Sequence, residues 1–185
     1  LEDWQKEIVG NIFGWKDKKT NLRKFRTVFI EVPRKNGKST LCAAIGLYML
    51  FADEERGSEV YSAAGDRQQA GIVFEIAKGM ILQSPELSQR GKVFRNSIVN
   101  ESKGNFYQAI SADSKTKHGF NANCIIFDEL HTQQNRDLWD VLVTSTGSRR
   151  QPLTIAITTA GYDKQSICYE IYSYAKKVQD GTIKD

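Results

Sequence analysis

A glycine, a lysine and a serine stand in a row at Gly37, Lys38 and Ser39, separated by four residues from a short apolar segment that ends at Val32. This order is typical of a phosphate-binding loop that leads into a helix. Glycine lets the backbone approach a phosphate and take a positive φ. Lysine carries a charge to the β- and γ-phosphates, and serine can ligate Mg²⁺. Free N–H groups at the start of the next helix would face the anion. These residues therefore predict a nucleotide-phosphate site.

The loop departs from the full phosphate-loop pattern, because Val32 stands where that pattern has its first glycine. A Gly-Lys-Ser run is also common by chance, and Ser39 would then only cap a helix at a surface turn. The run lies between a predicted buried strand and a predicted buried helix. This position favours the phosphate loop, since it is the context that the motif requires.

Two carboxylates, Asp128 and Glu129, follow the apolar run 124–127. An aspartate at the tip of a buried strand is placed to hold Mg²⁺ or its water, and a neighbouring glutamate can polarise an attacking water as a general base. Taken alone, the pair would be interpreted as two solvated acids at a strand end. Together with the phosphate loop, it predicts nucleotide hydrolysis.

The apolar pattern predicts strands that alternate with helices. Short β-branched or apolar runs predict strands at 27–32, 59–64, 92–99, 105–110, 124–127 and 153–159, with a hairpin turn at 100–104. Helical spacing predicts helices at 4–13, 38–52, 70–81, 138–142 and 167–178. The alternation indicates one α/β domain with a mainly parallel sheet and helices on both faces. We expect the ligand beyond the carboxyl ends of the strands, and strand 153–159 beside the strand that ends at Asp128.

Composition limits the class of protein. The 185 residues, 40% hydrophobic and 26% charged, suffice for one domain and exclude a disordered, collagen-like or disulfide-scaffold chain. The net charge of +4 permits binding to a polyanion without requiring it, and a basic loop is expected at 16–24.

Three cysteines without a CxxC pair indicate reduced core residues of a cytosolic protein. The longest uncharged apolar run, 41–52, is too short to span a membrane. The chain starts at Leu1 without a signal-peptide core, so we expect a piece of a longer protein.

Further blocks accompany these two motifs in a fixed order. Trp4-Gln5 precedes the loop Arg34-Lys35-Asn36-Gly37-Lys38-Ser39, and Thr158-Thr159-Ala160-Gly161 follows the acidic pair. Between them come 60–64 with 67–70, then Ser111-Ala112-Asp113 and His118-Gly119 before 125–130. The ordered set resembles the N-terminal ATPase domain of the large terminase subunit of tailed double-stranded DNA bacteriophages, over essentially the whole chain. In that family these blocks are an adenine-recognising glutamine motif, a deviant phosphate loop with an arginine, and a coupling motif.

The resemblance implies a P-loop NTPase of the ASCE or RecA-like type, a single ATPase domain over residues 1–185, and hydrolysis of ATP with Mg²⁺. The implied site residues are catalytic Glu129, Arg34 and Lys38; nucleotide-binding Gln5, Arg34, Lys35, Asn36, Gly37, Lys38, Ser39 and Thr40; metal-binding Ser39 and Asp128; and coupling Thr158 and Thr159.

The family further implies a ring-forming motor that packages double-stranded DNA into a procapsid, with a portal protein and a small terminase subunit as partners. Its location would be the host cell cytoplasm, transiently at the procapsid portal, without membrane association. We expect the isolated chain to be monomeric. We also expect residues 1–185 to lack the C-terminal nuclease domain of the family, because no acidic metal cluster follows Gly161. Nuclease activity is therefore not expected.

Several alternatives stay open at this point. Arg34 could act on the γ-phosphate in cis, or a neighbouring subunit could supply a basic residue such as Lys115, Lys117 or His118, which could equally form a solvated loop. His131 could contact the γ-phosphate or cap the next segment. The nearest rival function is the first motor domain of a DExH-type helicase. A nucleotide-binding module without turnover and a non-catalytic DNA-binding domain are the others; Glu129 and the modest net charge argue against them.

Overall fold

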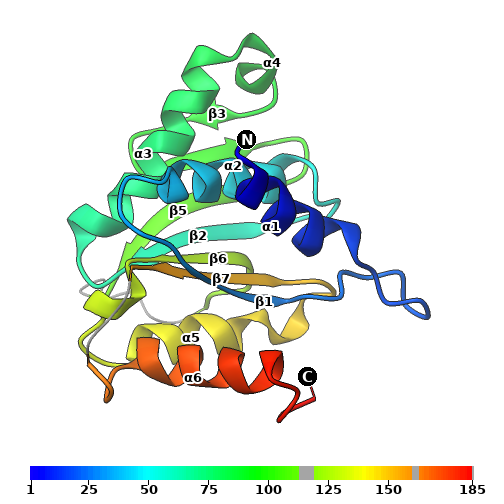
Figure 1. Cartoon of the computed structure of the whole chain (residues 1–185). Helices are drawn as coiled ribbons and strands as arrows, with labels where there is room; N and C mark the ends of the chain where they lie inside the picture. Colours follow the sequence, from blue (N-terminus) through cyan, green and yellow to red (C-terminus); the bar gives the residue numbers. More distant parts are fainter. Residues whose placement is uncertain (113–118, 160–162, 185) are drawn as a thin grey trace.

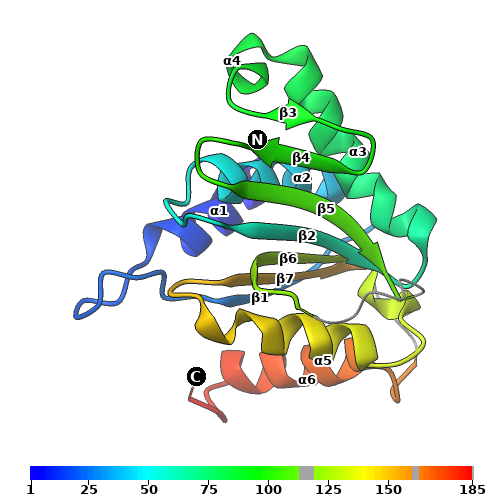
Figure 2. The same ribbon diagram turned by 180° about the vertical axis from the view of Figure 1, so that it is seen from behind.

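The computed structural model describes residues 1–112, 119–159 and 163–184, which form a sheet between two helical layers (Figures 1 and 2). Within these residues the strand order is β1-β7-β6-β2-β5-β4-β3, parallel from β1 to β5 and antiparallel at the β4 and β3 edge. The strands are β1 (Thr27–Glu31), β2 (Glu59–Ala64), β3 (Lys92–Val93), β4 (Ser97–Asn100), β5 (Asn105–Ser111), β6 (Ala122–Asp128) and β7 (Leu153–Thr158).

Helices cover both faces of this sheet, as predicted. Figure 1 shows α1, α2 and α3 on one face and α5 and α6 on the other. The helices are α1 (Asp3–Gly14), α2 (Lys38–Phe51), α3 (Arg67–Gln83), α4 (Pro85–Ser88), α5 (Asp137–Thr144) and α6 (Ile167–Gln179), with 3₁₀ turns η1 (Leu130–Thr132) and η2 (Ser145–Ser148). Each face has its own apolar cluster, so the sheet is buried on both sides. None of the described helices is long and apolar enough to cross a membrane.

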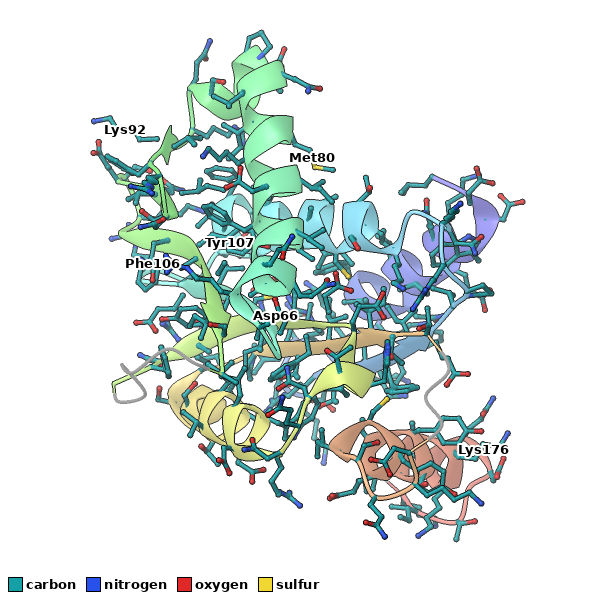
Figure 3. All side chains as sticks on the ribbon, turned by 90° about the vertical axis from the view of Figure 1, so that its left-hand side faces the viewer. Asp66, Met80, Lys92, Phe106, Tyr107 and Lys176 are labelled. Atoms are coloured by element: carbon teal, nitrogen blue, oxygen red, sulfur yellow. The ribbon has the colours of Figure 1, made fainter. Side chains whose placement is uncertain are left out.

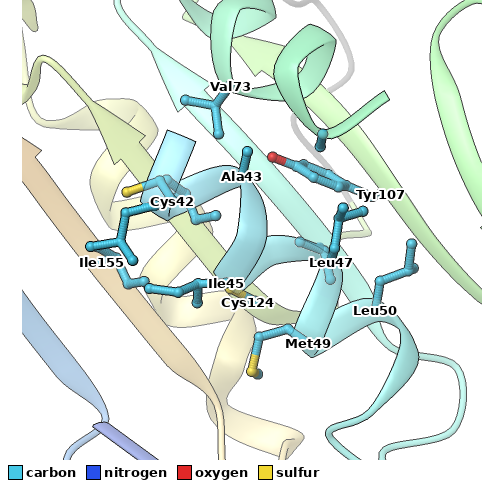
Figure 4. Close-up of a cluster of buried hydrophobic side chains, with 14 of the residues drawn as sticks. Cys42, Ala43, Ile45, Leu47, Met49, Leu50, Val73, Tyr107, Cys124 and Ile155 are labelled. Carbon is cyan, nitrogen blue, oxygen red and sulfur yellow. The ribbon is translucent and has the colours of Figure 1, made fainter. Parts of the chain in front are cut away.

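Helix α2 is the centre of the larger cluster, as its nearly continuous apolar sequence predicts. Figure 4 shows its side chains between the sheet and α3, close to Val73 and Tyr107. Gly46 allows this close approach, because a Cβ there would lie only 3.1 Å from the Tyr107 ring. The three cysteines are free and buried. Tight packing fixes α2, and therefore the residues of its first turn, relative to the strand ends.

The predicted strand 92–99 is wrong as a single element. The chain turns after Val93, where Phe94 N donates to Ser97 O, and β3 and β4 then pair antiparallel with each other. Figure 3 shows this edge beside α3, which rises from Asp66 toward Met80 with Lys92 near its far end. Pro85 is where α4 begins, with the preceding Ser84 as its N-cap. The turn at 100–104 joins β4 to β5 as expected.

Candidate nucleotide-binding site

The loop between β1 and α2 folds as a phosphate-binding turn would require. Gly37 takes a left-handed conformation (φ 71°) as the N-cap of α2, and Lys35 also has a positive φ of 67°. The Asn36 side-chain amide donates to the carbonyl oxygens of Pro33 (3.1 Å) and Arg34 (3.3 Å). The turn therefore places the residues that follow it in the first turn of a buried helix, where free N–H groups favour an anion.

Ser39, in that first turn, meets the end of β6, which lies two strands from β1 in the sheet. Its hydroxyl donates to Oδ2 of Asp128 (3.2 Å), whose Oδ1 accepts from the backbone N–H of Glu129 (3.0 Å). Asp128 is only 2% exposed, and burial together with the adjacent Glu129 carboxylate raises its pKa, against the opposing effects of the Ser39 bond and of Lys38. Because burial and the Glu129 carboxylate both disfavour the negative charge of Asp128, a cation bound to Asp128 would stabilise its charged form.

Lys38 and Glu129 form a close ion pair. Lys38 Nζ lies 2.6 Å from Glu129 Oε1, with side-chain exposures of 8% and 18%. Glu129 also has left-handed backbone angles (φ 49°, ψ 52°), which cost about 1–3 kcal/mol for a residue other than glycine. Non-glycine residues in this region concentrate at functional sites. The arrangement brings the predicted phosphate-binding cation and the predicted general base into one place.

The end of β7 supplies the other side of the site. The Nδ1 atom of His131 lies 2.8 Å from Thr158 Oγ1 and 3.3 Å from Glu129 Oε2. The Thr158 hydroxyl also lies within hydrogen-bond distance of Thr159 O (2.8 Å). Thr159 Oγ1 lies 3.5 Å from Glu129 Oε2. The two predicted coupling residues are thus linked to the predicted base, one directly and one through the histidine.

Gln5 reaches the same loop from α1. Its Oε1 accepts from Glu2 N (3.0 Å) in a capping box, and its Nε2 lies 3.4 Å from where a Cβ of Gly37 would stand. The side chain that was predicted to recognise adenine therefore also caps its own helix. Its amide end is adjacent to the phosphate loop.

The family of this chain follows from a match over nearly its whole length. A family model described as "Terminase large subunit, ATPase domain" matches residues 3–177. The chain belongs to this family. The resemblance and the fold class inferred from the sequence are confirmed, and the family match favours a terminase over the DExH helicase.

Large terminases of bacteriophages are similar to this terminase ATPase domain in sequence and in structure. The large terminase subunit of Enterobacteria phage HK97 is 34% identical over 170 residues, which are 86% of this chain and 31% of that protein. The crystal structure of the HK97 large terminase matches with a TM-score of 0.84 at 26% identity, covering 97% of this chain and 37% of the other. The chain thus spans about a third of the length of these relatives. The ATPase domain of the Thermus phage P74-26 large terminase shares the fold, with a TM-score of 0.62 at 18% identity over 90% of this chain and 73% of the other.

The remaining predicted residues of the terminase domain lie around this centre. Arg34, Lys35 and Thr40 are exposed at the loop and the start of α2. Within the described residues, the Arg34 side chain has no ion-pair partner. Other predictions fall outside the described residues: Lys115, Lys117 and His118 as candidates for a trans-acting cation, and Ala160 and Gly161 of the coupling motif.

Sequence reasoning missed two features of the site. The strained backbone of Glu129 has no signal in the residue types, because it depends on how η1 packs after β6. Gly65 at the end of β2 lies against the same turn, where a Cβ would meet the Thr132 carbonyl oxygen at 3.1 Å. A glycine directly after a buried strand was the available signal for this close approach.

Proposed function

We propose that this chain is the ATP-hydrolysing motor domain of a viral terminase that packages double-stranded DNA. The 2.6 Å pair between Lys38 Nζ and Glu129 Oε1 carries the proposal, with the Ser39–Asp128 contact beside it. Lys38 at the N-terminus of α2 is placed to bind a polyphosphate, and Glu129 beside it is placed to accept a proton from an attacking water. Membership in the terminase ATPase family supports ATP as the nucleotide, and the fold is shared by the large terminase of a thermophilic bacteriophage, whose structure was solved in complex with ADP.

Each loop residue has a role in binding the nucleotide. Gly37 and the first-turn N–H groups of α2 hold the phosphates, together with the exposed side chains of Lys35 and Thr40. Asn36 holds the loop in shape through its two bonds to main-chain carbonyls. Gln5 lies beside Gly37 and is the candidate for contact with the base.

Mg²⁺ fits the donors that the chain offers. Ser39 Oγ and Asp128 Oδ2 are hard oxygen ligands 3.2 Å apart, of the kind this ion prefers. Mg²⁺ held there would neutralise negative charge on the phosphates of the nucleotide. The chain's own contribution is to hold one hydroxyl and one buried carboxylate in place.

Hydrolysis needs Lys38 and Glu129 to separate. The Lys38 ammonium group exchanges the Glu129 carboxylate for phosphate oxygens, which frees Glu129 to accept a proton from water. The water oxygen forms a bond to the γ-phosphorus, the bond from that phosphorus to the β–γ bridging oxygen breaks, and the released electron pair stays on ADP. Thr159 and His131 contact the second oxygen of Glu129 and orient it.

Arg34 is our candidate for charge stabilisation on the γ-phosphate in cis. It is exposed on the loop, where no described residue forms an ion pair with it. A trans-acting residue from a neighbouring copy is the alternative, and such a finger contributes about 10³–10⁵ in rate. If a neighbouring copy supplies this cation, the isolated domain lacks it, so on this alternative we propose a weak, monomeric ATPase that becomes active when the motor assembles as a ring.

The partners and location follow from the proposed role. They are double-stranded DNA, a portal protein and a small terminase subunit, met in the host cytoplasm and transiently at the procapsid portal. Thr158 and Thr159 would couple hydrolysis to movement, since they link the strand end of β7 to Glu129. Nuclease activity is not expected from residues 1–185.

Single-turnover ATP hydrolysis across a series of protein concentrations tests the proposal. We expect slow, Mg²⁺-dependent hydrolysis that is lost in Arg34→Ala and kept in the control Arg90→Ala, another exposed arginine. A rate per protein molecule that rises with protein concentration would favour the trans-acting finger, and a rate that is already fast and independent of concentration would favour Arg34 in cis. No Mg²⁺-dependent hydrolysis at any concentration would contradict the proposed function.

A further inference from the structure

One short segment accounts for the positive sign of the chain's net charge. Residues 16–26 contain six of the 26 basic residues and one of the 22 acidic residues, a net charge of +5. The other 174 residues therefore sum to −1. The six basic residues are Lys16, Lys18, Lys19, Arg23, Lys24 and Arg26. We call residues 16–26 the basic hairpin.

The basic hairpin is an ordered turn. Lys16 and Arg23 form an antiparallel bridge, and Asp17 N donates to Leu22 O (2.9 Å). The Asp17 carboxylate accepts from the N–H groups of Lys19 (3.1 Å) and Thr20 (2.8 Å) and from the Thr20 hydroxyl (2.9 Å). These bonds lower the Asp17 pKa, so the carboxylate stays ionised while it closes the turn.

A buried ion pair anchors this hairpin to the domain. The Arg23 guanidinium pairs with Asp53 just after α2, and its Nη1 donates to Gln151 O (2.7 Å) ahead of β7. Both side chains are almost completely buried. Arg23 therefore anchors the hairpin to the domain. The other basic side chains of the hairpin do not take part in this anchor and can contact an external partner.

Five cations of the basic hairpin are exposed: Lys16, Lys18, Lys19, Lys24 and Arg26. Within the described residues none of them forms an ion pair. Lys24 Nζ lies 5.7 Å and 5.3 Å from the ring centroids of Trp15 and Phe25, which are themselves 56% and 40% exposed. The surface is thus a group of unneutralised cations supported by solvent-exposed aromatic rings.

The basic hairpin and the nucleotide site lie at opposite ends of β1. The hairpin leads directly into Thr27 at the start of the strand, and the phosphate loop follows Glu31 at its end. Five residues of strand separate them by about 16 Å. Figure 1 shows the hairpin projecting from the right-hand side, with the β1-to-α2 connection on the left. Its charge is therefore not needed to hold ATP.

We propose that the basic hairpin binds the phosphate backbone of double-stranded DNA. The inference deepens the proposed function, because it names a surface by which the motor holds its DNA. Lysines act as point charges without a fixed geometry, so they suit contacts to phosphates that are independent of base sequence. A motor that moves along DNA requires such contacts, and each one releases counterions on binding.

Fluorescence anisotropy with a labelled duplex tests the inference. We compare the parent chain with Lys18→Glu/Lys19→Glu at the hairpin tip and with Lys164→Glu/Lys176→Glu, an exposed pair around α6 with the same change in charge. We expect the tip variant to bind at least about tenfold more weakly at low salt and to reduce the salt slope by about 2, at about 0.9 per phosphate contact. The α6 variant should stay within about twofold of the parent. Lys18→Gln/Lys19→Gln, with a milder change in charge, should show an intermediate loss.

Several results would overturn the inference. These are a parent chain that does not bind duplex DNA, equal losses in the tip and α6 variants, and a tip variant that keeps its DNA affinity but loses association with other copies or an acidic protein. MgATP hydrolysis is measured on the same preparations and should be unchanged in both variants. Loss of DNA binding with intact hydrolysis separates this inference from the proposed ATPase activity. Absent hydrolysis with hairpin-dependent DNA binding would refute the proposed function alone.

Discussion

Lys38 Nζ lies 2.6 Å from Oε1 of Glu129, although the two residues are 91 positions apart in the chain. The cation that would hold the phosphates and the carboxylate that would activate water therefore neutralise one another before a nucleotide arrives. A phosphate at the start of α2 competes with Glu129 for the same ammonium group. Binding of ATP would in this way release the base at the moment when its substrate is present.

Replacement of Lys38 by alanine should abolish hydrolysis and weaken nucleotide binding. The variant removes the cation from the transferring phosphates, and we expect a loss of at least about a hundredfold in rate. Rates of ATP hydrolysis and titration with a fluorescent nucleotide measure the two effects. Lys92→Ala, which removes an exposed lysine paired with Glu101, is the control and should keep both. Normal turnover in Lys38→Ala would exclude the phosphate-loop assignment.

Glu129→Gln should bind MgATP but hydrolyse it about 10²–10⁴-fold more slowly, because the amide keeps the shape of the side chain and cannot accept the proton. The same variant removes the partner of Lys38, so nucleotide affinity should be equal to that of the parent or higher. Binding and single-turnover hydrolysis are measured on one preparation. If the variant hydrolyses ATP at the parent rate, Glu129 is not the general base.

Thr159→Val should leave ATP affinity near normal, whereas packaging by the full-length motor falls more than hydrolysis. The change keeps volume and branching but deletes the hydroxyl that lies 3.5 Å from Glu129 Oε2. Thr154→Val is a matched control, since Thr154 is a buried threonine near the start of β7, the strand that ends just before Thr159. Packaging and hydrolysis that decline in parallel, or that both stay unchanged, would refute the coupling role.

Asp128→Asn should raise the melting temperature of the nucleotide-free domain while it removes Mg²⁺-dependent hydrolysis. Burial raises the Asp128 pKa in the folded state above its ordinary value of 3.8, so ionisation of this group opposes folding. Below pH 3.8 the melting temperatures of the variant and the parent should be equal. The difference in favour of the variant should grow as the pH rises through the raised pKa of Asp128 in the folded state. Each kcal/mol gained corresponds to about 2–4 °C for a domain of this size.

Thermal unfolding from acid to neutral pH measures this effect. An asparagine can still accept from Glu129 N and donate to Ser39 Oγ, so the local contacts persist in the variant. A melting temperature that falls at neutral pH would show that the charged form of Asp128 stabilises the fold instead.

The sequence by itself determined the elements that carry the site, because their signals are local. The apolar run of α2 and the glycine before it predicted a buried helix with a phosphate loop at its start, and the structure places Gly37 as the N-cap with φ 71°. Strand β6 and its acidic end were equally clear from one short run of residues. The strand 153–159 was expected beside it, and β7 does pair with β6 in parallel. The ordered motifs were sufficient for the family.

Only the tertiary structure decided how these residues meet. The ion pair of Lys38 with Glu129 and the contact of His131 with Thr158 join residues from different elements, and such distances depend on how α2 and η1 pack against the sheet. The turn that divides 92–99 into β3 and β4 depends on the partner strand at the sheet edge. The basic loop at 16–24 was visible in the sequence. Its place at the start of β1, opposite the phosphate loop, also follows from chain order. Its anchor does not, because the ion pair of Arg23 with Asp53 joins segments that are 30 residues apart and depends on how they pack.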